Sequence, residues 1–268
     1  MKYPYLSDCH CHSNCSFDAD DPVNMLCENA IRQGLYALTV TDHCECNVYH
    51  QTGALSSIRQ SFLETKKAAA LFQGELRVLK GIELGQPMVN PELAKSILEK
   101  HEFDYVIGSV HKIGTLTLSN VAYNAHNVED ICLNYLDAIY ELADEGDFDC
   151  LGHIDMIRLY AAKQGTPLDM LEYEDQLVPI LRRVIERGKG IEINTTGFRQ
   201  EISTTLPNLD LLKLYRSLGG QIVTIGSDAH CTADIGSGWS ESAILAKQAG
   251  FDYVTLYEKR RPILIPIE

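Results

Sequence analysis

YLSDCHCHSNCSFDADDPVNMLCENAIRQGLYALTVT, residues 5–41, contains one complete strand–helix–strand unit. The segments Tyr5–His12 and Tyr36–Thr41 are short runs typical of strands, and Pro22–Gln33 between them carries apolar residues at helical spacing. Gly34 follows the helix, where glycine is the preferred residue just past a helix end. This order predicts two parallel strands with the helix packed outside them.

The same alternation continues along the chain. Further strands are predicted at Leu76–Leu84, Tyr105–His111, Cys150–Ile154, Gly190–Thr195 and Gln221–Asp228. Further helices are predicted at Leu55–Gln73, Pro91–His101, Val128–Glu145, Glu172–Arg187, Leu209–Leu218 and Ile235–Ala249. No linker interrupts the pattern, so we expect one α/β domain over residues 1–268.

Three segments do not fit this alternation. Cys44–Leu55 and Arg158–Asp175 are expected to be irregular loops that follow strand ends, where a barrel carries its functional loops. The tail, Phe251–Glu268, is expected to form a last short strand and an exposed terminus.

The formal net charge of −14 limits the possible partners. Such an acidic surface repels the backbone of nucleic acids and does not attract anionic membranes, so we expect neither as a partner. A phosphorylated substrate would then need local positive charge, which bound metal ions supply. The first residues resemble neither a secretory signal nor a membrane helix, and the nine cysteines form no C-x-x-C pair. We therefore expect a cytoplasmic protein with reduced thiols.

The first predicted strand ends with Asp8-Cys9-His10-Cys11-His12. Residues two apart in an extended chain point to the same side. His10 and His12 should therefore face one way, and Cys9 and Cys11 the other. Two imidazoles are thus expected to point towards a common centre.

Metal-ligand residue types recur at six of the seven predicted strand ends. They are His10 and His12, His43, Glu83, His111, His153, and Asp228 with His230. Such groups are costly to bury without partners, and a shared polynuclear metal site would satisfy all of them. Histidines and carboxylates suit Zn²⁺, Mn²⁺ or Fe²⁺, and Glu83 is the candidate bridging ligand. Two neighbouring ions can clamp a phosphoryl group, so phosphoester hydrolysis is the expected chemistry.

Six motifs carry a family resemblance. They are D-C-H-C-H at Asp8–His12, T-D-H at Thr41–His43, G-I-E at Gly81–Glu83, S-V-H at Ser109–His111, G-H-I-D at Gly152–Asp155 and G-S-D-A-H at Gly226–His230. In this order, from about Leu6 to His230, they resemble the polymerase and histidinol phosphatase (PHP) superfamily. The resemblance implies a distorted (β/α)7 barrel with three divalent metal ions at the carboxyl ends of the strands. It also adds Asp18, giving nine implied ligands: His10, His12, Asp18, His43, Glu83, His111, His153, Asp228 and His230.

Within this superfamily the chain looks most like the stand-alone histidinol-phosphatases. The supporting segments are His153–Arg158 and Asn194–Arg199. The resemblance implies that Arg158 and Arg199 bind phosphate, as suits a planar guanidinium. It implies hydrolysis of L-histidinol phosphate, in histidine biosynthesis, by a metal-bridged hydroxide, with Glu83 and Asp228 as catalytic residues. The group that protonates the leaving alcohol stays open.

Other interpretations remain open at this point. One alternative is a related phosphoesterase that acts on nucleotides or small phosphate esters. The others are a metal-dependent amide hydrolase and a non-catalytic metal domain of the kind that some polymerases retain. Lys112 is a further candidate near the phosphate, and Glu45 and His50 are candidates for contact with the amine or imidazole of histidinol. Cys44 and Cys231 are interpreted as packing residues. The sequence does not indicate an oligomeric state.

Overall fold

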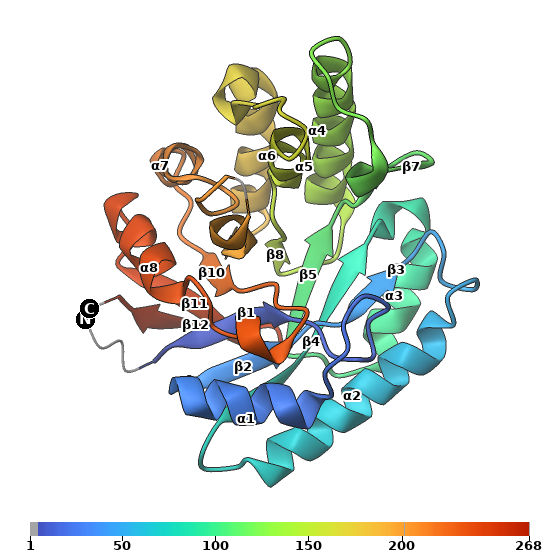
Figure 1. Ribbon diagram of the computed structural model, residues 1–268, viewed down its shortest axis with the longest axis vertical. Helices are drawn as coiled ribbons and strands as arrows, with labels where there is room; N and C mark the ends of the chain where they lie inside the picture. Colours follow the sequence, from blue (N-terminus) through green and yellow to red (C-terminus); the bar gives the residue numbers. More distant parts are fainter. Residues whose placement is uncertain (1–4, 201, 268) are drawn as a thin grey trace.

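A computed structural model describes residues 5–200 and 202–267. Seven parallel strands form the wall of a nearly closed barrel, and each is paired with the next one in the series (Figure 1). They are β1 (Ser7–Cys11), β2 (Ala37–Val40), β4 (Arg77–Gly85), β5 (Tyr105–Ser109), β8 (Cys150–Leu151), β9 (Gly190–Asn194) and β10 (Val223–Gly226). The expected distorted (β/α)7 barrel is confirmed.

The ring closes where β1 and β10 meet at their carboxyl ends. The backbone N–H of Asp228 donates to the carbonyl oxygen of His10 at 2.7 Å, and that of His12 donates to the carbonyl oxygen of Ala229 at 2.8 Å. The first and last strands of the barrel therefore hold each other at the edge where the candidate ligands lie.

Helices surround the strands, as Figure 1 shows. They are α1 (Val23–Gln33), α2 (Ala54–Leu71), α3 (Pro91–Lys100), α4 (Val128–Glu145), α5 (Met156–Ala162), α6 (Glu174–Glu186), α7 (Leu209–Ser217) and α8 (Trp239–Gln248). The expectation of an irregular segment at Arg158–Asp175 is wrong at its start, which α5 occupies. The last helix begins at Trp239 instead of Ile235, because Gly236 and Gly238 before it adopt left-handed φ values of +70°.

A short strand that the sequence did not indicate, β3 (His43–Glu45), overlaps the start of the segment expected to be a loop, Cys44–Leu55. It pairs in parallel with β4, and His43 lies opposite Glu83 in the register. Two more short strands, β6 (Lys112–Ile113) and β7 (Leu116–Thr117), form a hairpin after β5. The pairing of β3 with β4 therefore places the candidate ligand His43 directly beside the candidate ligand Glu83.

The expectation of a single strand in the tail is wrong, and the terminal residue Glu268 lies outside the described residues. The tail forms an antiparallel hairpin of β11 (Tyr253–Glu258) and β12 (Arg261–Pro266). Leu256 is fully buried, and Arg260 at the turn donates to both carboxylate oxygens of Asp149 at 3.1 Å. Asp149 immediately precedes β8, so the hairpin covers the amino end of the barrel, opposite the candidate ligands.

The two cysteines of β1 do not share a face, contrary to expectation. The register of β1 against β2 shifts between Asp8 and Cys11. Cys9 packs in the larger core cluster, and its thiol donates to the carbonyl oxygen of Thr255 in the hairpin. Cys11 belongs to a separate cluster beneath α1. This irregularity breaks the simple alternation on which the expectation rested.

Candidate metal centre

The barrel brings all the histidine and carboxylate candidates to one end. His10 lies on β1, Glu83 on β4 and His43 on β3, while the other candidates follow the ends of β1, β5, β8 and β10. His10, His12 and Glu83 are essentially inaccessible to solvent. A cluster of buried ionisable groups this dense requires mutual pairing or bound ions.

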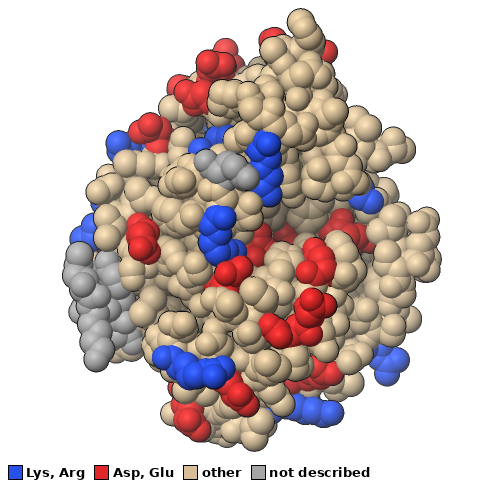
Figure 2. All heavy atoms as spheres, in the orientation of Figure 1, with Lys and Arg blue, Asp and Glu red and all other residues tan. Residues whose placement is uncertain are grey.

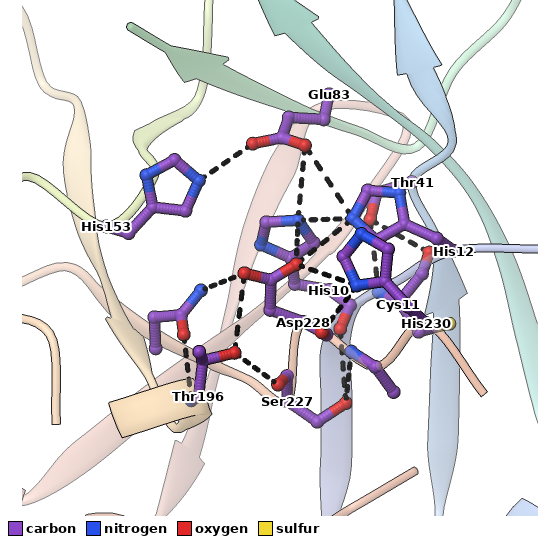
Figure 3. A network of polar contacts seen from close by, with 12 residues as sticks. His10, Cys11, His12, Thr41, Glu83, His153, Thr196, Ser227, Asp228 and His230 are labelled. Carbon is purple, nitrogen blue, oxygen red and sulfur yellow. Dashed lines mark hydrogen bonds and ion pairs between the residues drawn. The ribbon is translucent and has the colours of Figure 1, made fainter. Parts of the chain in front are cut away.

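Glu83 contacts imidazoles from several strands, and Figure 3 shows its carboxylate between His153 on one side and His10 and His12 on the other. Its Oε2 is 2.8 Å from His43 Nδ1 and 3.5 Å from His10 Nε2. Its Oε1 is 2.9 Å from His153 Nε2 and 3.2 Å from His111 Nε2. Each carboxylate oxygen thus faces a different set of imidazoles, which is the arrangement required of a bridging ligand.

Two aspartates complete the opposite side of the cluster. Asp228 Oδ1 is 3.2 Å from His12 Nε2. Asp18 Oδ2 lies 3.4 Å from His43 Nε2 and 3.3 Å from His230 Nε2. All nine implied ligands therefore face the cluster, including Asp18, which only the family resemblance had indicated.

The charges in the cluster shift its pKa values strongly. Burial, followed by the charge of the neighbouring His43, lowers the pKa of His12 to about 3. Burial would also lower the pKa of His111, but the carboxylates of Glu45 and Glu83 outweigh it and raise the value to about 10. Burial would raise the pKa of Glu83, yet the surrounding imidazoles hold it well below its usual range. Such shifts are concentrated at functional sites.

The donor set fits divalent metal ions. Three overlapping groups have ligand atoms within 4.8 Å of one another: His12, His43 and His230; His10, His12 and Glu83; and His43, Glu83 and His111. His43 Nδ1 and Glu83 Oε2 are buried without a hydrogen-bond partner even though they lie 2.8 Å apart. Atoms that converge without hydrogen-bond geometry are what metal ligands present, and histidine with carboxylate suits divalent ions of the zinc and iron type.

A cavity of about 750 Å³ opens over the cluster. Its lining includes Asn14, Ser16, Phe17, Asp18, His43, Glu45, Gln51, Glu83, His111, Lys112, Ser119, His153, Tyr160, Asp228 and His230. The hollow visible in Figure 2 has acidic side chains in and around it and basic side chains at its edge. The volume is ample for a small phosphate ester.

The structure does not place the two candidate phosphate-binding arginines in the lining of this cavity. Arg158 is buried, and its guanidinium donates to Asp155 Oδ2 at 3.0 Å and to the carbonyl oxygen of Thr205 at 2.7 Å. Arg199 lies closer to the ligands, because its Nη2 donates to the carbonyl oxygen of Ser227, next to Asp228, at 2.7 Å. Phosphate binding by either arginine stays a prediction.

The three weaker candidates for contact with the substrate differ in their position relative to the cavity. Lys112 lines the cavity, whereas the exposed His50 does not. Glu45 lines the cavity too, but its Oε1 lies 2.7 Å from His111 Nδ1, so it already has a partner.

Sequence reasoning missed several groups directly behind the candidate ligands. Ser16 Oγ lies 3.2 Å from His12 Nδ1, accepts from the backbone N–H of His43 and donates to Asp42. Glu192 Oε1 lies 2.6 Å from His10 Nδ1. Asp42 stands within the T-D-H motif, so its position was a signal. Glu192, between two isoleucines of a strand, was an overlooked buried carboxylate.

Comparisons with known proteins agree with this geometry. The PHP domain family model matches residues 8–196. A probable histidinol-phosphatase of Clostridium acetobutylicum is 30% identical over 259 residues, covering 94% of this chain and 97% of that protein. The histidinol-phosphatase of Lactococcus lactis is 26% identical, covering 91% of each.

Solved structures share the fold. A histidinol phosphate phosphatase from Lactococcus lactis, complexed with zinc, L-histidinol and phosphate, superposes with a TM-score of 0.79 at 23% identity, covering 96% of this chain and 98% of that one. A putative histidinol phosphatase from Listeria monocytogenes gives a TM-score of 0.75 at 19% identity, covering 88% and 99%. Among the described residues, no helix is long and apolar enough to span a membrane. The chain therefore belongs to the PHP domain family, among relatives of the histidinol-phosphatase type.

Proposed function

We propose that this chain is a metal-dependent phosphomonoesterase that hydrolyses L-histidinol phosphate to L-histidinol and phosphate in histidine biosynthesis. The observation that carries the proposal is the convergence of imidazoles and carboxylates around Glu83 beneath a cavity of about 750 Å³. The names of the Clostridium and Lactococcus relatives, which align over 94% and 91% of this chain, support the substrate. The substrate is a small molecule, and the proposed location is the cytoplasm.

The proposed ligand set holds three divalent ions, with zinc, manganese or iron as the candidates. It consists of His10, His12, Asp18, His43, Glu83, His111, His153, Asp228 and His230. Such ions neutralise phosphate charge and lower the pKa of bound water. Zinc is supported by the Lactococcus structure, whose description names it.

Glu83 and Asp228 are the proposed catalytic residues. The two oxygens of Glu83 face separate imidazole sets and so hold the subsites at a fixed separation. Asp228 Oδ2 accepts from Asn194 Nδ2 at 3.1 Å, which leaves Oδ1 directed towards His12 and the cluster. Asp228 is thereby oriented to accept a proton from the attacking water at Oδ1.

Arg199 and Arg158 are proposed to bind phosphate, and Arg199 has the stronger support. Its guanidinium lies against the backbone that carries Asp228, and its ion pair with Asp234 is partly exposed and so costs little to open. Arg158 would have to leave a buried pair with Asp155. Arg199→Ala should therefore raise the KM for histidinol phosphate more than Arg158→Ala does; equal, unaltered KM values for both variants would contradict this part.

The test is phosphate release by protein loaded separately with Zn²⁺, Mn²⁺ or Fe²⁺. The substrates are L-histidinol phosphate, nucleoside monophosphates and an aryl phosphate. We expect high kcat/KM for histidinol phosphate alone, loss of activity in Glu83→Gln, and full activity in the control His50→Ala, whose side chain does not line the cavity. Comparable activity on nucleotides, or none on histidinol phosphate, would refute the proposed substrate.

A further inference from the structure

β9 is the barrel strand whose end carries no proposed ligand, yet two of its side chains reach the ligand cluster. Glu192 and Asn194 are two residues apart on this strand, so their side chains lie on the same side of it. They are 1% and 0% exposed. A carboxylate buried this deeply must be held by several donors. Its partners show what it does.

Glu192 contacts parts of the chain that carry different proposed ligands. Its Oε1 lies 2.6 Å from His10 Nδ1, across the barrel closure. Its Oε2 accepts from the backbone N–H of His153 at 2.9 Å and from Asn194 Nδ2 at 3.2 Å. Asn194 Nδ2 also lies 3.1 Å from Asp228 Oδ2. One carboxylate is thus linked directly to two ligand residues and, through one amide, to a third.

The contact with His10 determines which ring nitrogen is free. A carboxylate accepts a hydrogen bond, so the proton of a neutral imidazole is on Nδ1 and the lone pair is on Nε2. His10 Nε2 lies 3.5 Å from both Glu83 Oε2 and Asp228 Oδ1, and 3.1 Å from His12 Nε2. The free nitrogen therefore faces the centre of the cluster.

The neighbouring strands leave room for this carboxylate. A Cβ at Gly226, on β10, would lie 2.4 Å from Glu192 Oε1. A Cβ at Gly152, after β8, would lie 3.7 Å from Oε2 and overlap Ser109. A side chain at Gly226 would therefore displace Glu192, whereas one at Gly152 would meet Ser109 first.

We infer that Glu192 is a positioning residue of the metal centre: it holds His10 in the tautomer that presents Nε2, and it sets the backbone of His153 and, through Asn194, the carboxylate of Asp228. Carboxylates behind metal-bound histidines act in this way, and their loss typically lowers metal affinity or activity by about 10- to 100-fold. The inference rests on the proposed metal centre and is independent of the substrate.

The test compares zinc affinity in wild type, Glu192→Gln and Asp149→Asn. Asp149 is the matched control, because it is also a buried carboxylate, 4% exposed, but it pairs with Arg260 at the opposite end of the barrel. Metal-free protein is titrated with Zn²⁺ in competition with a chromophoric chelator. In Glu192→Gln the amide oxygen can still accept from His10 Nδ1. Its NH₂ group then faces the N–H donors of His153 and Asn194, so those two hydrogen bonds are lost.

We expect zinc affinity about 10- to 100-fold weaker in Glu192→Gln and unchanged in Asp149→Asn. The rise in Tm on adding zinc should shrink in the first variant only. If Glu192→Gln does not fold, Glu192→Asp is used, since its shorter carboxylate cannot span the same donors and should show the same loss. Wild-type affinity in the folded variant would overturn the inference and leave the metal centre intact, whereas wild-type protein that binds no zinc would overturn the metal centre itself.

Discussion

Gly226→Ala is the substitution whose effect can be worked out most directly from the structure. Gly226 does not have a positive φ, so alanine is acceptable to its backbone. Its new Cβ would, however, lie 2.4 Å from the Cβ of His10 and 2.4 Å from Glu192 Oε1. Non-bonded carbons normally sit about 3.5–4.0 Å apart, so β10 and β1 would have to separate by about 1 Å.

Two magnitudes follow from this separation. Forcing an extra methyl into a packed site costs about 1–3 kcal/mol. For a chain of this size each kcal/mol lowers Tm by about 2–4 °C, so the expected fall is about 2–12 °C. A functional site tolerates displacements of about 0.5 Å, and a 1 Å misplacement can cost about 100-fold in rate. We therefore expect kcat for histidinol phosphate to fall about 100-fold in the metal-loaded protein.

The assay is steady-state phosphate release at saturating metal, together with thermal unfolding. Gly34→Ala is the control, because Gly34 ends α1 with φ +75° and has no atom within 4 Å of an added Cβ. Its left-handed backbone costs an alanine about 1–2 kcal/mol without touching the site. If Gly226→Ala keeps wild-type kcat and Tm, or if Gly34→Ala loses as much activity, the steric reasoning is wrong.

Three further predictions concern other parts of the molecule. Chelation should abolish phosphatase activity and lower Tm, because the buried carboxylates and imidazoles then lose the ions that pair them; re-addition of metal should restore both, and unchanged activity in chelator would contradict a metal-dependent reaction. Arg260→Ala should lower the free energy of unfolding in urea by about 1.5–3 kcal/mol, because the buried Asp149 loses a charged partner, while kcat stays unchanged. Burial raises the pKa of Cys150 to about 12, so at pH 8 its thiol stays protonated; iodoacetamide should label Cys231, the one cysteine that is not buried, first, and early labelling of Cys150, detected by peptide mass spectrometry, would show that the core opens.

The alternation of strands and helices was readable from the sequence because each unit carries its own local signals. The helix Val23–Gln33 ends at Gly34, as its glycine indicates. The hairpin was not readable in this way. Its turn residues Lys259 and Arg260 have φ values of +50° and +59°, where asparagine or glycine is the usual signal. Tertiary contacts with Asp104 and Asp149 stabilise the turn instead.

The candidate ligands were readable because they repeat at strand ends, whereas the groups behind them do not repeat. Asp18 lies in a loop, so no strand or helix periodicity in the sequence indicates that it faces His43 and His230. Glu192 contacts His10 across 182 residues of sequence, a pairing that only the closed barrel creates. By contrast, the spacing of Asp155 and Arg158 on one helical turn already favours an ion pair, which the structure contains.

The closure of β1 against β10 has a consequence for the order of events during synthesis. His12 and Asp228 lie 3.2 Å apart in space but 216 residues apart in the chain. At about 5–20 residues per second, a ribosome needs about 10–40 s to make the intervening segment. A nascent chain that has folded only its first strands thus presents only part of the proposed ligand set. The complete proposed site can therefore assemble only after β10 has been synthesised.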